Sequence, residues 1–293
     1  MPSAAGAVRL GSGGTLSSTS SRGLSDAEVV QLLRREFARE LRRARRRKRQ
    51  AFLDLFAGSG GVARAIRDRG FACVAFDLAA GPQYDLTRRC VKGLIEEWLR
   101  TGRVLGVVCA TPCGTWSAAL RVKPMPDSGR SLRSRDHIWG LPNLSAHERS
   151  KVKAGNATLR AAVRIVKACV AASAPAIVEN PVGSLLFFAP PMQKLMGHPA
   201  ADAISLDQCQ FGTPWRKRTR LVGWHVPSLE DSALLCQGSG GLCSATGRPH
   251  LVISGRHPDG AQWGPITQEY PEALCSAIAD ALVDSADTRK RRD

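Results

Sequence analysis

Short apolar runs alternate with helical patterns along residues 51–224, and this alternation constrains the fold more than any other feature of the sequence. Runs of strand length occur at 51–56, 71–77, 104–110 and 176–180, and helical patterns occur at 61–70, 96–103, 153–173 and 271–284. Strands that alternate with helices form a mostly parallel sheet, through right-handed crossovers that cover both of its faces. Two further short strands, 205–211 and 219–224, predict an antiparallel hairpin at one edge. We therefore expect an α/β, Rossmann-like fold.

The composition is that of a globular protein with a large excess of positive charge. Of 293 residues, 43% are apolar and 23% charged, which excludes wholesale disorder. The 42 Lys and Arg against 25 Asp and Glu give a net charge of +17, which favours nucleic acid or an anionic membrane surface as a partner. No apolar run reaches the length of a membrane span, and the N-terminus lacks a signal-peptide apolar region. We expect no membrane association and an intracellular location, nuclear if the source is eukaryotic.

Composition also divides the chain into segments. We expect a flexible Gly/Ser-rich segment, a basic helical extension, a catalytic domain and a basic tail, at 1–24, 25–50, 51–285 and 286–293. The extension opens with a capping box formed by Ser25 and Glu28. Residues 1–50 carry 12 Lys and Arg against 4 Asp and Glu, a surplus of +8. Two interpretations stay open: a nucleic-acid arm or nuclear-import signal, or a solvated helix.

Two segments inside the domain have unusual compositions. Residues 121–155 hold eight Lys and Arg against three acidic residues, which favours a loop that faces a polyanion over an ordinary solvated insertion. Residues 225–268 are rich in Gly and contain Cys and His. The nine cysteines of the chain lack a regular disulfide-like spacing, so we expect thiols, metal ligands or a nucleophile.

The first two strands end in residues that suit an adenosine cofactor. The sequence Phe56-Ala57-Gly58-Ser59-Gly60-Gly61 follows the first strand, and Asp77 ends the second, 19 residues after Gly58. Glycines allow a ligand to approach the backbone at a helix N-terminus, and an acid here can accept hydrogen bonds from ribose hydroxyls. The alternative is a tight strand–helix turn without a ligand-binding role.

The next two strands end in a nucleophile and an acid. Cys113 lies in the segment Thr111-Pro112-Cys113 after strand 104–110, and Glu179 comes directly after strand 176–178. Carboxyl ends of parallel strands share one edge of a sheet, so both side chains should face the adenosine pocket. A hydride-transferring dehydrogenase, the first alternative, has no use for them.

These motifs resemble, in the same order, those of the cytosine-5 methyltransferase family. The stretch 54–61 is similar to its cofactor loop, Asp77 to its ribose-binding acid, Pro112-Cys113 to its nucleophile motif, and Glu179-Asn180 to its glutamate-asparagine motif. The stretch 216–220 lies where the family carries its arginine-containing motif. The resemblance covers roughly 51–224 and is closest to compact phage and protist versions.

The resemblance implies an S-adenosylmethionine-dependent methyltransferase fold. It assigns catalysis to Cys113, Glu179, Arg218 and Arg220. It assigns cofactor binding to Asp54, Phe56, Gly58, Gly60, Gly61, Asp77, Asp85 and Pro112.

Several positions depart from the family pattern. Thr111 replaces the first proline of Pro-Pro-Cys, and Asn180 is followed by proline instead of valine. Trp215 occupies the glutamine place of Gln-x-Arg-x-Arg. The final Gly-Asn motif is absent, with 267–281 only positionally similar, and some 40 residues after Gly223 are too few for a separate target-recognition domain.

The reaction that the resemblance implies is methyl transfer to carbon 5 of cytosine. The Cys113 thiolate adds to carbon 6 and makes carbon 5 nucleophilic. A positively poised site would raise the thiolate content. Glu179 would share a proton with ring nitrogen 3, and Arg218 or Arg220 would bind the carbonyl oxygen.

We expect nucleic acid as the partner, DNA ahead of RNA, although phosphate-directed charge does not distinguish them. The alternatives are an RNA cytosine methyltransferase and a non-catalytic nucleic-acid-binding protein on a methyltransferase fold.

A zinc site is the last expectation. Cys236, Cys243 and His250 follow each other as Cys-x6-Cys-x6-His, and Cys209 would be the fourth ligand, with His257 in reserve. The segment around them has too few apolar residues for a core of its own. A bound metal would stabilise it in place of such a core. This spacing is wider than that of a common zinc knuckle, and unrelated thiols in a flexible loop are the alternative.

Overall fold

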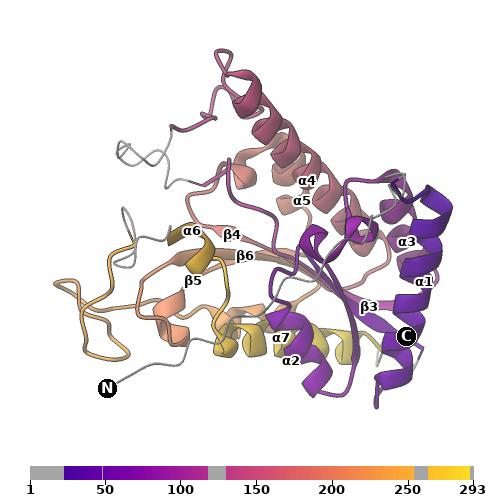
Figure 1. Ribbon diagram of the computed structural model, residues 1–293. Coiled ribbons are helices and arrows are strands. Elements are labelled where there is room, and N and C mark those ends of the chain that lie inside the picture. The colour runs from indigo at the N-terminus through magenta and orange to yellow at the C-terminus, as the bar shows by residue number, and fades with distance from the viewer. Residues whose placement is uncertain (1–22, 48, 118–129, 254–262, 291–293) are drawn as a thin grey trace, which may run out of the picture.

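The computed structural model describes residues 23–47, 49–117, 130–253 and 263–290, and it contains one six-stranded sheet (Figure 1). The strands are β1 (Ala51–Leu55), β2 (Ala72–Phe76), β3 (Val104–Cys109), β4 (Ala176–Pro181), β5 (Ala201–Asp207) and β6 (Arg218–Trp224). Their order in the sheet is β2-β1-β3-β4-β6-β5, with β1 to β4 parallel and β6 antiparallel to both of its neighbours. The expected Rossmann-like α/β fold with an antiparallel hairpin edge is confirmed. Strand β5 ends at Asp207, and the expected continuation to Phe211 is a short 3-10 helix instead.

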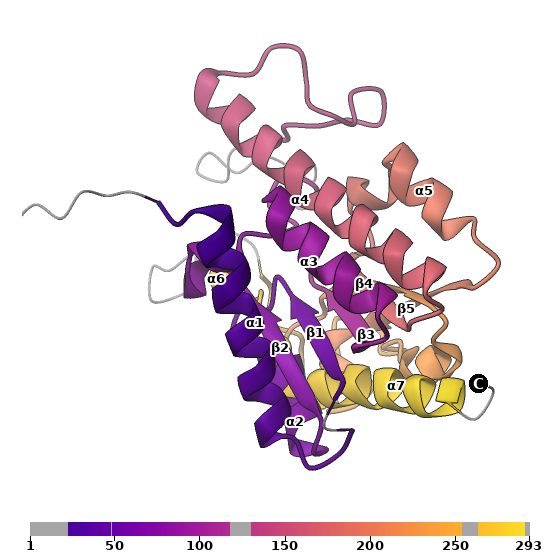
Figure 2. The ribbon, with the colours of Figure 1, turned by 90° about the vertical axis from the view of Figure 1, so that its right-hand side faces the viewer.

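Helices cover both faces of the sheet, as Figure 2 shows for α3 and α4 on one side and α7 on the other. One face carries α1 (Asp26–Arg43), α3 (Arg89–Arg100), α4 (Ala146–Ala171) and α5 (Pro190–Met196), and the opposite face carries α2 (Gly61–Asp68) and α7 (Glu272–Lys290). A short helix, α6 (Trp263–Ile266), precedes α7. Side chains alternate across each strand. In β1, Leu53 therefore packs into the core under α1, α3, α4 and α5, and Phe52 packs into the core under α2 and α7.

The N-terminal helix is part of the core instead of an extension of it. Its expected capping box is present, with Ser25 and Glu28 bonded reciprocally. Val29, Leu33 and Phe37 are fully buried, and the Phe37 ring lies 4.3 Å from the ring of Trp98 on α3. This apolar stripe at four-residue spacing needs a partner, which α3 and β2 provide.

Five arginines of this helix and of the turn after it pair with carboxylates. Arg34 bonds Glu97 at 2.9 Å, and Arg46 and Arg47 both bond Asp287 near the end of α7. These pairs weaken the interpretation of the segment 25–50 as a free nucleic-acid arm.

Helix α4 begins seven residues before the expected residue 153, because Ser145 and Glu148 form a second capping box. The last ten residues of the expected basic loop 121–155 are therefore helical, and residues 118–129 lie outside the described part of the chain. Arg133 is also not available to a polyanion. It is 1% exposed, its guanidinium lies 3.4 Å from the centre of the Trp116 ring, and it donates to Asn156 and to backbone carbonyls.

Among the described residues, no helix is both long and apolar enough to cross a membrane.

Candidate active site

A cavity of about 550 Å³ opens at the carboxyl ends of β1, β3 and β4. The chain order of the strands reverses between β1 and β3, and ligands of open α/β sheets bind at such a switch point. The volume is typical of a site for a cofactor-sized molecule. Most of the expected site residues line it, namely Asp54, Phe56, Gly58, Gly61, Asp77, Asp85, Pro112, Cys113 and Glu179. Gly60, Arg218 and Arg220 do not.

The glycine-rich turn is shaped by positive φ angles. Phe56, Gly58 and Gly60 have φ values of 58°, 53° and 71°, and the glycines adopt them without strain. Gly61 has a different reason to be glycine, because a Cβ atom there would lie 2.6 Å from the Sγ atom of Cys275 on α7. Gly61 thus allows α2 to pack on α7, while Gly58 and Gly60 bend the loop around the cavity.

The carboxylate of Asp77 joins the ends of the first two strands. Its Oδ2 atom accepts a hydrogen bond from the Gly58 amide at 2.8 Å, and its Oδ1 atom accepts one from the Ala79 amide at 2.9 Å. A carboxylate has about four acceptor positions, so further lone pairs can accept hydrogen bonds from a ribose. Asp85 is placed similarly, with its Oδ1 atom accepting bonds from the amide and hydroxyl of Thr87.

Asp54 lies beneath this turn and has a structural task. It is 2% exposed, and its Oδ2 atom accepts a hydrogen bond from the Ala63 amide in the first turn of α2. Burial raises the pKa of Asp54 to about 7, although the Ala63 hydrogen bond opposes this effect.

The nucleophile loop is held by the neighbouring strand. The buried Asn180 side chain donates hydrogen bonds to the carbonyls of Thr111 and Glu179, at 2.6 and 2.9 Å. The carbonyl of Cys113 accepts bonds from the amides of Trp116 and Ser117. These bonds fix Cys113 beside Glu179, on the same cavity wall.

The protonation states differ from the expected positively poised site. The pKa of Cys113 is raised by burial and by the charge of Glu179, and the cation of Lys217 only partly opposes this. Burial also raises the pKa of Glu179, against the influence of Lys217 and of the Tyr270 hydroxyl. Desolvation therefore outweighs the single nearby cation and disfavours the thiolate, in contrast to the positively poised site expected from the sequence.

Glu179 has an open hydrogen-bonding position. Its Oε1 atom is buried without a hydrogen-bond partner among the described residues. A buried acceptor or donor of this kind costs stability unless a ligand satisfies it, which fits the binding of a polar ring in the cavity.

Arg218 and Arg220 lie on the opposite face of the sheet from Glu179. In the antiparallel pair of β4 and β6, Asn180 stands opposite Arg220 and Glu179 opposite Leu221. Opposite residues share a face and successive residues alternate, so Arg218 and Arg220 project on the side of Asn180. Arg218 pairs with Asp207 at 2.8 Å, and the Arg220 guanidinium lies 5.4 Å from the centre of the Phe187 ring.

Two residues that sequence reasoning missed complete the cavity. Lys217 lines it and donates a hydrogen bond from Nζ to the Thr267 carbonyl at 2.7 Å. Counted from Trp215, the two arginine places of Gln-x-Arg-x-Arg fall on Lys217 and Thr219, and this count could have identified the lysine. The Tyr270 hydroxyl, just before α7, is buried near Glu179 and influences its pKa. No motif in the sequence singles it out.

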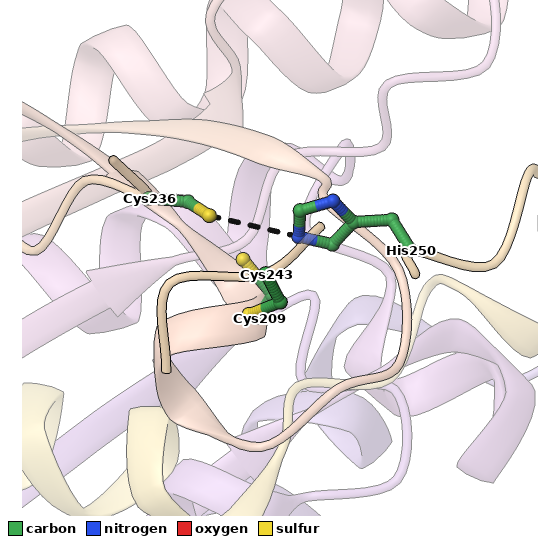
Figure 3. A group of neighbouring side chains, drawn as sticks. All are labelled: Cys209, Cys236, Cys243 and His250. Atoms are coloured by element: carbon green, nitrogen blue, oxygen red, sulfur yellow. Dashed lines mark hydrogen bonds between the residues drawn. The ribbon is translucent and has the colours of Figure 1, made fainter. Parts of the chain in front are cut away.

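A separate cluster contains Cys209, Cys236, Cys243 and His250 (Figure 3). Their ligand atoms all lie within 4.8 Å of one another, and the Sγ atom of Cys236 is 3.6 Å from the Nε2 atom of His250. None of the four residues lines the cavity. The reserve candidate His257 lies outside the described residues.

No protein-family model matches the chain, and no curated protein matches its sequence. Among solved structures, the S. pombe Dnmt2 methyltransferase is similar to it, with 13% sequence identity and a TM-score of 0.31. The similarity covers 66% of this chain and 58% of that one, so the chain spans less than two thirds of the length of Dnmt2. A likeness at this level says nothing of the reaction, which the residues of the cavity have to support by themselves.

Proposed function

We propose that this protein transfers a methyl group from S-adenosylmethionine to carbon 5 of cytosine in DNA, through a covalent bond to Cys113. One observation carries the proposal. The thiol of Cys113 and the carboxyl group of Glu179 border the same cavity as the Gly58–Asp77 turn, although they come from different strands. A thiol, an acid and an adenosine-type pocket together suit an addition reaction at an electron-poor ring.

The cavity residues would divide the work as follows. The Cys113 sulfur adds to carbon 6, and the electron pair of the carbon 5–carbon 6 double bond becomes available at carbon 5. Glu179 gives its proton to ring nitrogen 3 and so neutralises the charge that builds up in the ring. Bound S-adenosylmethionine supplies an electrophilic methyl group on a sulfonium centre. Loss of the carbon 5 proton to a base, with return of the nitrogen 3 proton to Glu179, then re-forms the double bond as the sulfur leaves carbon 6.

The raised pKa of Glu179 is compatible with the roles proposed for Glu179 and Cys113. Burial raises the pKa of Glu179 and so favours its protonated form, which is the form that can donate to nitrogen 3. A neutral Glu179 also no longer opposes ionisation of Cys113, which its negative charge otherwise does. The Lys217 cation then favours the thiolate, and two of its three donors remain for the carbonyl oxygen of the ring.

Exposed cations on α4 would bind the phosphates. Arg149, Lys151 and Lys153 lie on its exposed N-terminal part. This helix passes beside the nucleophile loop, since a Cβ atom at Gly155 would lie 2.7 Å from the hydroxyl of Thr115. A duplex hides the target base, so the enzyme would flip it out or take single strands. Exchange of both lysines for glutamate should reduce the salt dependence of DNA binding, and an unchanged salt slope would exclude this surface.

The decisive experiment measures transfer of a tritiated methyl group from S-adenosylmethionine to DNA, to RNA and to a control without nucleic acid. DNA should be labelled, and Cys113→Ser should abolish both the labelling and covalent trapping on a fluorocytosine-containing oligonucleotide while keeping the fold. Glu179→Gln should slow transfer by about 100-fold or more. Cys90→Ser, which changes a thiol that donates to Asp26 and does not line the cavity, is the matched control.

Labelling of RNA alone would keep the mechanism and change the substrate. Unimpaired transfer by Cys113→Ser would refute the covalent mechanism. Binding of DNA without any transfer would favour a non-catalytic nucleic-acid-binding protein.

A further inference from the structure

We propose that Cys209, Cys236, Cys243 and His250 bind one structural zinc ion. A tetrahedral site with Zn–S near 2.3 Å and Zn–N near 2.0 Å requires a sulfur-to-nitrogen separation of about 3.6 Å and sulfur-to-sulfur separations of about 3.8 Å. The Cys236 Sγ atom lies 3.6 Å from His250 Nε2, and all four ligand atoms lie within 4.8 Å of one another. Figure 3 shows the four side chains gathered in one cluster. Three thiolates and an imidazole are a common zinc set, and soft sulfur ligands disfavour magnesium and calcium.

The segment that carries three of these ligands has no apolar core of its own. Cys209, Cys236 and Cys243 form a small buried cluster that no other apolar side chain among the described residues joins. The large apolar side chains nearby point to solvent instead, with Leu234, Leu242 and Val252 exposed by 47%, 44% and 73%. Ordering these residues costs conformational entropy that burial does not offset here. Metal–thiolate bonds would offset it.

The hydrogen bonds around the sulfur atoms suit thiolates. The amide and hydroxyl of Ser244 both point to the Cys236 sulfur, at 3.4 and 3.5 Å. The side-chain amide of Gln210 donates to the sulfurs of Cys209 and Cys243, at 3.6 and 3.9 Å. Second-shell donors of this kind orient metal ligands and stabilise their charge.

The cluster also accounts for two arginines that the cavity does not use. Zinc with three thiolates carries a net charge of −1. Beside it, the fully buried carboxylate of Asp207 accepts a hydrogen bond from the Cys236 amide at 2.9 Å. Arg216 and Arg218 both bond this carboxylate, and Arg216 also donates to the Cys236 carbonyl. These two cations balance the negative charge that the carboxylate and the zinc centre bring together.

The ion would hold a structure in place and take no part in the reaction. Four protein ligands leave no open coordination position, and none of them borders the cavity. Two hydrogen bonds link the chain next to the metal ligands with the stretch that carries Lys217. The Leu251 amide donates to the Pro214 carbonyl at 2.7 Å, and the Gln208 amide, next to Cys209, donates to the Lys217 carbonyl at 3.1 Å.

The test is metal analysis of the untagged full-length chain, purified without chelator. We expect about one zinc per chain, with Cys243→Ser and His250→Ala losing it and melting at lower temperature. His250→Cys should keep the metal, since four thiolates also bind zinc, and Cys90→Ser is the matched thiol control. Replacement by cobalt should give the visible spectrum of a tetrahedral thiolate site, and this readout on the unaltered chain remains if a variant fails to fold.

Three results would overturn the proposal. A metal-free chain whose melting temperature does not respond to added zinc would exclude the site. Retention of zinc by both Cys243→Ser and His250→Ala would place the metal elsewhere. A disulfide between two of the three cysteines, found by thiol counting on the native protein, would replace the metal by a covalent link. None of these readouts depends on methyl transfer.

Discussion

Exchange of Lys217 for methionine should impair methyl transfer, whereas the same exchange at a neighbouring arginine should not. Lys217 borders the cavity and holds the Thr267 carbonyl with one of its three donors. Arg220, three residues later, lies on the opposite face of the sheet and stacks near Phe187. Arg220→Met therefore removes the same charge from the same basic stretch, with the same replacement, and leaves the cavity intact.

The expected loss follows from the geometry. If Lys217 binds the ring oxygen where negative charge develops, its removal should lower methyl transfer by about 100- to 1000-fold, the usual cost of one donor of this kind. The pH dependence should change as well. Lys217 lowers the pKa of both Cys113 and Glu179, so both values should rise in Lys217→Met. Because the thiol must ionise to add to carbon 6, the acid side of the rate profile should move to higher pH.

Single-turnover methyl transfer over a range of pH values measures both effects, and Lys217→Arg should recover part of the rate by restoring the charge. Thermal melting checks that neither variant has lost its fold. An Arg220→Met variant as impaired as Lys217→Met, or a Lys217→Met variant with the unaltered rate and pH profile, would refute the assignment.

Three further perturbations have definite outcomes. Asp77→Ala should weaken S-adenosylmethionine binding in calorimetry by about 10- to 100-fold, as expected for lost hydrogen bonds to a carboxylate, and unchanged affinity would contradict the ribose assignment. Phe37→Ala should lower the free energy of unfolding in urea by about 3–5 kcal/mol, because the ring is fully buried; a loss below about 1 kcal/mol would show that α1 is peripheral. Burial raises the pKa of Asp54 to about 7 in the folded protein, from near 4 in an unfolded chain. Folding therefore favours the protonated form, and the free energy of unfolding should fall by up to about 4 kcal/mol as pH rises from 4 to above 7. Asp54→Asn should flatten that part of the stability curve, and an unchanged curve would show that Asp54 does not titrate there.

The strand ends could be located from sequence because parallel strands of an open sheet are buried on both faces. Such strands read as continuous apolar runs, and whatever follows them must lie at one edge. The strand ends thus predict that Gly58, Asp77, Cys113 and Glu179 lie at one edge of the sheet, and all four line the cavity. This prediction needs only the order of the elements, which local patterns supply.

Local sequence patterns do not predict features that depend on packing between distant elements. The stripe of Val29, Leu33 and Phe37 is compatible with either a solvated helix or a buried one, and only the presence of Trp98 on α3 decides. The raised pKa of Cys113 is unpredictable for the same reason, since desolvation depends on how deeply the cavity wall is enclosed. Tyr270 lies near Glu179 because α7, which follows it, packs on the face of the sheet that carries Glu179.

The basic stretch 216–220 shows how one strand can serve two sites. Side chains alternate along it, so Arg216 and Arg218 reach Asp207 beside the cysteine-histidine cluster while Lys217 turns into the cavity. A shift of one residue in the pairing of β6 with β4 would exchange these faces, placing an arginine in the cavity and leaving the buried Asp207 without its cations. Leu251, next to the ligand His250, is bonded to Pro214 just before this stretch, and Gln208, next to the ligand Cys209, is bonded to Lys217 within it. A zinc ion at the cluster would therefore hold the register on which the position of Lys217 depends.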